Sequence, residues 1–177
     1  MTAPIRWPAE AVWEAVAPLL PGFTVEVLPS IDSTNTELMR RARAGQTEPT
    51  LLVAEQQTAG RGRLGRVWQS DVGASLMLSL GLPMAPRDWS GLSLAVGVSV
   101  AESLQPTLPP LEPGQPPRIG LKWPNDLWLS GDRKLGGILV ETASFVAPQA
   151  AHPAPAHGTA TRYVVVGIGI NVLPRSG

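Results

Sequence analysis

The sequence predicts an α+β fold, with a mixed, mostly antiparallel β-sheet and helices packed on one face. Two observations indicate it. Helical and strand-like segments alternate up to residue 104, and after residue 118 the patterned segments are almost all strand-like. The chain has 177 residues and no internal repeats, so a single domain over residues 1–177 with a sizeable core is expected.

The N-terminal half predicts two helices. Residues 9–20 carry apolar side chains at helical spacing and end at Pro21-Gly22, and residues 37–44 form the second helix, which Gly45 ends. Hydroxyls at residues 33–36 precede the second helix and can cap it. Strands are predicted at residues 23–28 and 51–54, and residues 57–71 form a long loop.

The C-terminal half is dominated by strands. Residues 74–82 are apolar enough for a central strand, and residues 89–104 have helical periodicity. Six prolines in residues 106–117 require a surface connection. Further strands are expected at residues 119–123, 127–129, 137–142 and 163–172, and the Pro/Ala-rich residues 146–161 connect the last two.

Composition excludes several classes of function. Fourteen basic and fourteen acidic residues cancel, so no global charge favours nucleic acid or a membrane. The absence of cysteine excludes disulfides, thiolate catalysis and cysteine-based zinc sites. The two histidines, His152 and His157, lie in a Pro/Ala-rich stretch without partners for a metal site. No signal peptide or long apolar run is present, so a soluble cytoplasmic protein is the expectation.

Positive charge is distributed unevenly by residue type. The chain has only two lysines, Lys122 and Lys134, whereas arginine supplies the other twelve basic side chains. Lysine is a mobile point charge and arginine a rigid planar fork, so this confinement favours a site where a point charge is needed. Chance in an arginine-rich composition is the alternative explanation.

The loop at residues 57–71 contains glycines and arginines in alternation. Gly60, Gly62 and Gly65 satisfy the dinucleotide-binding pattern and, with Val67, the kinase glycine-loop pattern. No helix follows the glycines directly, and the kinase catalytic segments are absent, so both matches are interpreted as false. Three closely spaced guanidinium groups can instead bind phosphate or carboxylate oxygens. A solvated basic turn is the alternative, which the ordering entropy of three glycines makes less favourable.

Two further segments have the chemistry of a binding site. In Lys122-Trp-Pro-Asn-Asp126 the proline restricts the backbone, so a turn can direct Asn125 and Asp126 together. Gly167-Ile-Gly-Ile-Asn171 ends an apolar strand, where paired glycines leave space for a flat group to pack on the sheet.

These segments together resemble the biotin protein ligases, also called biotin–acetyl-CoA-carboxylase ligases. The motifs occur in family order and span residues 33–171; they are Ser33-Thr-Asn35, Gln57 with Gly60-Arg-Gly-Arg-Leu-Gly-Arg66, Lys122-Trp-Pro-Asn-Asp126, Asp132-Arg-Lys-Leu-Gly-Gly-Ile-Leu-Val-Glu141 and Gly167-Ile-Gly-Ile-Asn171. The resemblance implies the catalytic-domain fold of biotin and lipoate ligases.

The resemblance also implies an activity in two steps. Biotin and ATP, the two substrates, give biotinyl-5′-AMP, and biotin then passes to a lysine of the biotin carboxyl carrier protein of acetyl-CoA carboxylase. Positive charge must lie where the biotin carboxylate meets the α-phosphate, because both are anions. The catalytic residues implied are Lys134, Arg63 and Lys122. Magnesium is expected with ATP, held mostly through phosphates and water, and no protein ligand for it is assigned.

Individual binding residues follow by resemblance. The biotin-binding residues implied are Ser33, Thr34, Asn35, Gln57, Gly60, Arg61, Gly62, Arg63, Lys134, Gly137 and Gly167. Those implied for ATP are Arg63, Arg66, Trp68, Lys122, Asn125, Asp126, Lys134 and Asn171. Trp68 could stack on adenine and Asn171 could bind its edge. Ser33 and Thr34 could equally be simple helix caps, and whether Asp126 helps to deprotonate the attacking lysine stays open.

The sequence departs from many family members at both ends. The residues before Ser33 are too few for an N-terminal helix-turn-helix domain, so DNA binding is not expected, and the C-terminal SH3-like domain is absent from this chain. A fragment, or a non-catalytic binder of biotin or biotinyl-adenylate, is therefore an alternative to a ligase. A lipoate ligase is the less favoured alternative, because the arginine-rich glycine motif favours biotin. A homodimer formed through the sheets is expected by analogy only.

Overall fold

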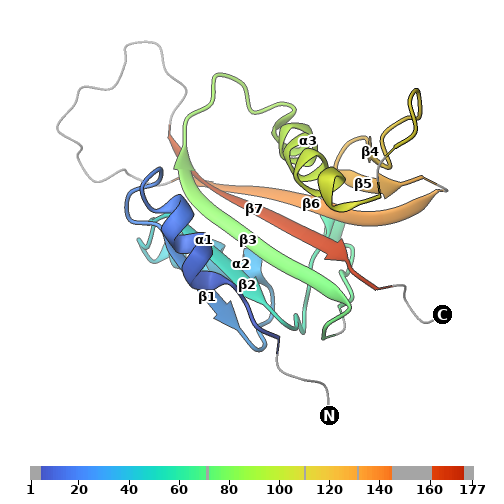
Figure 1. Cartoon of the computed structure of the whole chain (residues 1–177). Helices are drawn as coiled ribbons and strands as arrows, with labels where there is room; N and C mark the ends of the chain where they lie inside the picture. Colours follow the sequence, from blue (N-terminus) through green and yellow to red (C-terminus); the bar gives the residue numbers. More distant parts are fainter. Residues whose placement is uncertain (1–4, 71, 110, 131, 145–160, 174–177) are drawn as a thin grey trace.

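The computed structural model describes residues 5–70, 72–109, 111–130, 132–144 and 161–173. These residues form one β-sheet of seven strands with three α-helices (Figure 1). Among them, no helix is both long enough and apolar enough to cross a membrane. The predicted connection at residues 146–161 lies almost wholly outside the described residues.

The sheet is mixed and mostly antiparallel, as predicted. Its strand order is β1-β2-β3-β7-β6-β5-β4. Only the β1–β2 pair is parallel, and each of the other five neighbouring pairs is antiparallel. The strands are β1 (Thr24–Leu28), β2 (Thr50–Ala54), β3 (Ser75–Met84), β4 (Ile119–Lys122), β5 (Asp126–Leu129), β6 (Arg133–Ser144) and β7 (Arg162–Asn171).

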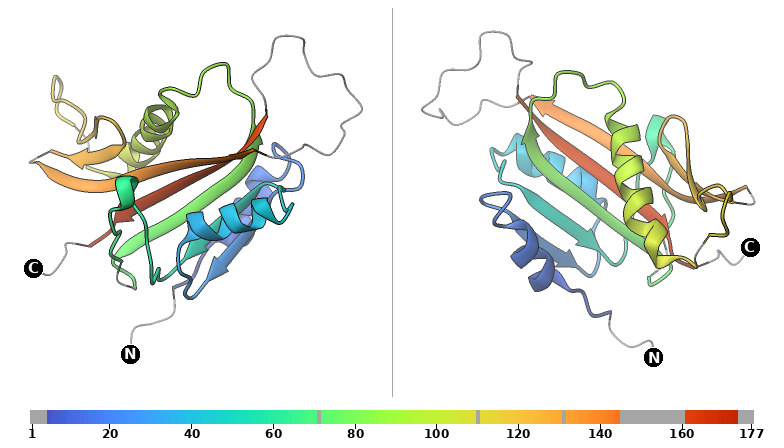
Figure 2. Two further views of the ribbon diagram at one scale, coloured as in Figure 1. Left: turned by 180° about the vertical axis from the view of Figure 1, so that it is seen from behind. Right: turned by 45° about the horizontal axis from the view of Figure 1, so that its top comes forward.

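The helices cover both faces of the sheet, so the prediction that they pack on one face is wrong in this detail. Tyr163 and Val165 of β7 pack with α2, whereas Val164 and Val166 pack on the opposite face with α3. Figure 2 shows α1 on the face of α3 and α2 on the other. The reason is visible in β7 itself, because an uninterrupted apolar strand requires cover on both faces. The helices are α1 (Ala9–Val16), α2 (Thr34–Arg43) and α3 (Leu92–Leu104).

Helix boundaries differ from the predicted ones at the caps. Helix α2 begins at Thr34 rather than residue 37, because Ser33 is its N-cap and its hydroxyl oxygen accepts from the Thr36 backbone N–H at 3.4 Å. Helix α1 ends at Val16, four residues before the predicted end, and turns occupy residues 17–22. Helix α3 begins three residues later than predicted, after Gly91 in the left-handed conformation. The predicted loop at residues 57–71 contains a short 3₁₀ turn, η1 (Arg63–Gly65), and a second one, η2 (Gln105–Thr107), follows α3.

The core on the α2 side is built around the single tyrosine of the chain. Tyr163 is 1% exposed and packs with Leu38, Leu52 and Val165. Its phenol lies over Gly81 of β3, where a Cβ atom would overlap the phenolic oxygen. Burial, opposed by the Arg41 cation and assisted by Glu48, raises the pKa of Tyr163 to about 12.

Candidate active site

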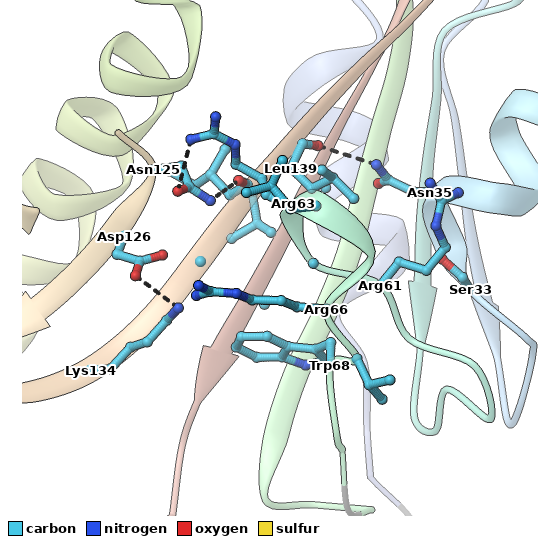
Figure 3. A pocket seen from close by; sticks show the side chains of 18 of the residues that line it. Ser33, Asn35, Arg61, Arg63, Arg66, Trp68, Asn125, Asp126, Lys134 and Leu139 are labelled. Carbon is cyan, nitrogen blue, oxygen red and sulfur yellow. Dashed lines mark hydrogen bonds and ion pairs between the residues drawn. The ribbon is translucent and has the colours of Figure 1, made fainter. Parts of the chain in front are cut away.

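The largest group of predicted site residues meets in one pocket of about 490 Å³ (Figure 3). The pocket lies where the N-terminus of α2, the loop before β3, the turn between β4 and β5 and the glycines of β6 and β7 come together. Among the predicted residues, those that line it are Ser33, Thr34, Asn35, Gln57, Arg61, Gly62, Arg63, Arg66, Trp68, Lys122, Asn125, Asp126, Lys134, Gly137 and Gly167.

Two predicted residues, Gly60 and Asn171, lie outside this lining. Gly60 supports the loop instead: its carbonyl accepts from the Trp68 N–H at 2.8 Å, and a Cβ there would lie 2.5 Å from the Trp68 carbonyl. The Asn171 amide nitrogen donates to the Lys134 carbonyl at 3.4 Å. Its buried Oδ1 has no hydrogen-bond partner among the described residues.

One wall of the pocket is polar and buried. Ser33, Thr34 and Asn35 are 2–4% exposed and come from the start of α2. The Gln57 Oε1 accepts from the Thr34 N–H at 2.8 Å and lies 3.1 Å from the Thr34 hydroxyl. Ser79 of β3, which sequence reasoning missed, lies beneath the wall, and its hydroxyl is 2.7 Å from Thr34 Oγ1 and 2.6 Å from Asn35 Oδ1.

The loop that leads into this wall is also held in place. The Ser33 N–H donates to Asp32 Oδ1 at 2.7 Å, and Arg40 forms an ion pair with the other carboxylate oxygen at 2.7 Å. Burial raises the pKa of Asp32, but the Ser33 N–H and the Arg40 guanidinium outweigh it, so the pKa lies below its usual value. Asp32 therefore stays ionised and keeps Ser33 in its capping position.

Asn35 connects the wall to the sheet. Its amide nitrogen donates to the Leu139 carbonyl at 3.2 Å and to Glu141 Oε2 at 3.0 Å. Both amide hydrogens are thus used within the protein, and only lone-pair capacity on Oδ1 is left for a ligand. Gly167 makes this position available, because a Cβ on it would overlap the Asn35 amide. Glu141, a second residue not predicted for the site, also pairs with Arg61 at 3.1 Å.

The glycine surface of β6 and β7 is occupied by a flat side chain, as the paired glycines predict, but that group belongs to the protein. The indole of Trp68 lies against Gly169, where a Cβ would be 2.6 Å from Cζ2, and its Cζ3 lies 3.7 Å from the corresponding point on Gly137. Figure 3 shows the ring beside the Arg66 side chain, at the base of the cluster of cations.

Five cationic side chains line the pocket, but only two have carboxylate partners among the described residues. Lys134 forms an ion pair with Asp126 at 2.9 Å, and Arg61 forms the pair with Glu141. The Lys122 ammonium lies over the Trp128 ring at 4.0 Å from its centroid, and Arg63 donates to Asn125 Oδ1 at 3.4 Å. The guanidinium of Arg66 has no hydrogen bond or ion pair with a described residue. This arrangement favours an anionic ligand.

The turn between β4 and β5 directs two polar residues into the pocket, as its sequence predicts. Asn125 is held by two hydrogen bonds to one residue of β6. Its side-chain amide nitrogen donates to the Ile138 carbonyl at 2.8 Å, and its backbone carbonyl accepts from the Ile138 N–H at 2.9 Å. Asp126 faces Lys134, and the two form the ion pair drawn in Figure 3. The Asn125 Oδ1 thereby points toward Arg63.

The pocket lining also includes nine residues that were not predicted for the site: Leu64, Val67, Leu78, Trp123, Pro124, Ile138, Leu139, Ile168 and Gly169. Leu64 and Trp123 line it although they are 90% and 79% exposed. Leu64 adopts φ of +56°, in the left-handed region, which is uncommon for a leucine. Neither feature has a signal in the sequence, because exposure and local backbone strain depend on the folded loop.

Residues 27–151 match the Biotin/lipoate A/B protein ligase family. The chain belongs to this family. It is 38% identical over 154 residues to the biotin–[acetyl-CoA-carboxylase] ligase of Mycobacterium tuberculosis and 40% identical over 158 residues to the bifunctional ligase/repressor BirA of Escherichia coli. These alignments cover 84% and 88% of this chain but 49% and 43% of the two relatives, so the chain spans about half of their length.

Solved structures of biotin ligases have the same fold as this member of the Biotin/lipoate A/B protein ligase family. The biotin acetyl coenzyme A carboxylase synthetase of Helicobacter pylori, with bound biotinylated ATP, superposes with a TM-score of 0.63 at 29% identity, covering 86% of this chain and 62% of that one. The biotin protein ligase of Aquifex aeolicus, in complex with biotin and ATP, gives a TM-score of 0.58 at 31% identity, covering 86% and 54%. The mixed, mostly antiparallel sheet is therefore the catalytic-domain fold of these ligases.

Proposed function

We propose that this chain is an ATP-dependent ligase that activates biotin as biotinyl-5′-AMP and transfers it to a lysine of a biotin carboxyl carrier protein. One observation carries the proposal. A buried polar wall lines the same pocket as three cations that have no carboxylate partner among the described residues, Arg63, Arg66 and Lys122. A neutral polar ring and an anionic tail on one ligand match those two features, and the named relatives and solved structures agree with biotin and ATP.

The wall is suited to the ureido ring of biotin. The Ser33 hydroxyl oxygen accepts from the Thr36 N–H, and its proton has no acceptor among the described residues, so it can donate to the ureido carbonyl. Gln57 has an amide nitrogen that donates to none of the described residues. Gly62 and Gly137 line the pocket along the chain of biotin. Gly167 leaves room for Asn35, which shapes the wall from behind. Gly60 contributes by holding the loop.

The cations are suited to the reacting groups. In the first step a carboxylate oxygen of biotin attacks the α-phosphorus of ATP, and the bond to pyrophosphate breaks. Lys134 and Arg63 would neutralise the charge that gathers as these two anions meet, and Lys122 and Arg66 would bind the phosphates. Lys134 must then exchange Asp126 for the ligand, which a flexible point charge can do. Arg61, anchored to Glu141, would hold the loop over the product.

The remaining nucleotide contacts fall near the glycine surface. Trp68 offers a ring for stacking. The buried Oδ1 of Asn171, which has no hydrogen-bond partner among the described residues, is an acceptor at the same end of β7. In the second step the lysine amine of the carrier attacks the carbonyl carbon of the mixed anhydride, and AMP leaves. A closed loop is needed there, because water would otherwise hydrolyse the anhydride.

A magnesium ion bound with ATP fits the residues that are present. Asp126 is the only carboxylate among the described lining residues, and no cluster of three acidic or histidine side chains occurs in the described ranges. A single carboxylate beside phosphate ligands is the usual arrangement for magnesium, which keeps several waters. Asp126, and Asn125 beside it in the pocket lining, would hold the ion, and the ion would supply charge neutralisation on the phosphates.

The experiment that tests the proposal is biotin-dependent exchange between ATP and pyrophosphate, followed by addition of a carrier domain. Exchange and a biotinylated carrier would support both steps. Exchange without transfer would confine the proposal to adenylate formation, whereas biotin binding without exchange would replace it with a non-catalytic binder. Exchange that depends on lipoate instead would reassign the substrate within the family. Sedimentation of the same sample tests the expected homodimer.

A further inference from the structure

The buried hydroxyl of Ser79 is not part of the pocket lining, yet it contacts two side chains of the wall. It is 0% exposed on β3, and its oxygen is 2.7 Å from Thr34 Oγ1 and 2.6 Å from Asn35 Oδ1. A third oxygen contact, at 3.1 Å, joins Thr34 Oγ1 to Gln57 Oε1. Three contacts between oxygens thus share two hydroxyl protons, one from Thr34 and one from Ser79.

The geometry determines where those protons lie. The Asn35 amide nitrogen is identified by its two acceptors, the Leu139 carbonyl and Glu141, so the atom that faces Ser79 is the oxygen. An amide oxygen has no proton, and the 2.6 Å contact therefore requires Ser79 to donate to Asn35.

Thr34 then has two acceptors for its single proton. Its contact with Ser79 is short, at 2.7 Å, whereas that with Gln57 is 3.1 Å, and two oxygens without a proton between them repel more strongly at the shorter distance. The Gln57 oxygen already accepts a hydrogen bond from the Thr34 backbone N–H at 2.8 Å. The Thr34 hydroxyl therefore donates to Ser79, and the Ser79 hydroxyl donates to Asn35. We call this sequence of donors the proton order.

We infer that Ser79 is a positioning residue that turns the Thr34 hydroxyl into an acceptor toward the pocket, and so selects a ligand with an N–H at that point. This rests on the proposed function, in which that N–H belongs to the ureido ring of biotin. A Thr34 hydroxyl whose proton is committed to Ser79 offers only lone pairs to a ligand. A ring oxygen in place of the ureido N–H, as in a cyclic carbamate, has no proton to donate to those lone pairs. The site would therefore bind such an analogue more weakly.

Neutron diffraction of the deuterated chain tests the order directly and requires no ligand. The expected map has the Thr34 hydroxyl deuteron on the line to Ser79. A deuteron on the line to Gln57 would overturn the inference. This result stands whether or not biotin binds, so failure of biotin to bind the wild-type chain would count against the proposed function and not against the proton order.

Ligand discrimination tests the consequence. Dissociation constants are measured for biotin and for two cyclic carbamate analogues, each with one ureido N–H replaced by a ring oxygen. The wild-type chain should disfavour one of the two analogues, and Ser79→Ala should reduce that discrimination by about fivefold, the factor expected for one hydrogen bond. Ser79→Cys keeps the volume with a poor donor and serves if the alanine variant does not fold. An unchanged ratio in a folded variant would contradict the inference.

A double-mutant cycle separates positioning from general damage. Thr34→Val removes the hydroxyl through which Ser79 acts, so Ser79→Cys should change the analogue ratio little in that background. Equal effects in both backgrounds would show that Ser79 acts on the fold alone and would overturn its assignment as a positioning residue.

Discussion

The indole ring of Trp68 lies against the backbone of Gly169, so closely that a Cβ on the glycine would be 2.6 Å from Cζ2 of the ring. The glycine therefore provides space for an aromatic side chain of the same protein, and the loop that carries Trp68 is seated on the sheet. Whatever stacks on Trp68 must use its other face or displace the ring.

Gly169→Ala should push the ring off the sheet. We expect a destabilisation of about 1–3 kcal/mol, as for overpacked sites, together with weaker ATP binding and a change in tryptophan fluorescence. Gly120→Ala is the matched control, because a Cβ on Gly120, also in a strand, would meet nothing within 4 Å. Identical ATP affinity in both variants would show that the position of the ring is unimportant for nucleotide binding.

Lys134→Ala should lower the rate of biotin-dependent pyrophosphate exchange by about a hundredfold or more, since a charge directed at the reacting centre is lost. The fold should persist, because among the described residues the substitution removes only the ion pair with Asp126, and the Lys134 side chain is 42% exposed. Arg133→Ala, one residue earlier on β6, is the control outside the pocket lining. Exchange at the wild-type rate would remove Lys134 from the proposed mechanism.

Arg63→Ala should accelerate leakage of biotinyl-AMP by about tenfold or more, the factor expected for a lost hydrogen bond to a charged group. Among the described residues the guanidinium hydrogen-bonds only to Asn125, at 3.4 Å, so its loss should leave the free energy of unfolding unchanged. Arg87→Ala, an exposed arginine outside the pocket lining, controls for net charge. The measurement is adenylate dissociation in the absence of carrier, and equal rates would argue against closure by this loop.

Glu141→Gln should remove the ion pair of this carboxylate with Arg61 while keeping its hydrogen bond with Asn35. The glutamine oxygen can still accept from Asn35, but the ion pair with Arg61 at 3.1 Å is lost. Because Arg61 is 49% exposed, the cost in unfolding free energy should be below about 1 kcal/mol, while Glu141→Leu, which strands the Asn35 donor, should cost more. Urea unfolding of the two variants compares them, and an equal loss would mean that the Asn35 contact contributes nothing.

The pKa of Tyr163 should lie well above the ordinary value for a tyrosine. Burial raises the pKa from 10.0 to about 12, so the folded state holds the phenolic proton more tightly than the unfolded state. Its contribution to stability is complete below pH 10 and is lost as the pH rises through 12. The chain has one tyrosine, so ultraviolet difference absorbance reports this group alone. Ionisation near pH 10 in the folded chain would contradict the burial described.

The site was more predictable from the sequence than the packing of the fold. Fifteen of the 24 lining residues were predicted, because side chains that need a particular backbone or charge leave a local signal. Ser79 left none, since a serine in an apolar strand is ordinary until Thr34 and Asn35 are brought above it. The placement of α2 and α3 on opposite faces was missed for a related reason. The run from Tyr163 to Val166 carried that information, but periodicity alone does not show which helix covers which face.

The pocket is lined by segments that extend from residue 33 to residue 169, and they meet only when β6 and β7 are paired and α2 is docked. No shorter stretch of the chain contains the binding site, so a ligand recognises the assembled sheet and not the unfolded chain. A free ligand concentration of about 100 times the Kd would then add about 2.7 kcal/mol to the unfolding free energy of the whole domain. In a thermal-shift titration with biotin or ATP, the melting temperature of the whole domain should consequently rise with ligand concentration. The affinity can be obtained from that dependence.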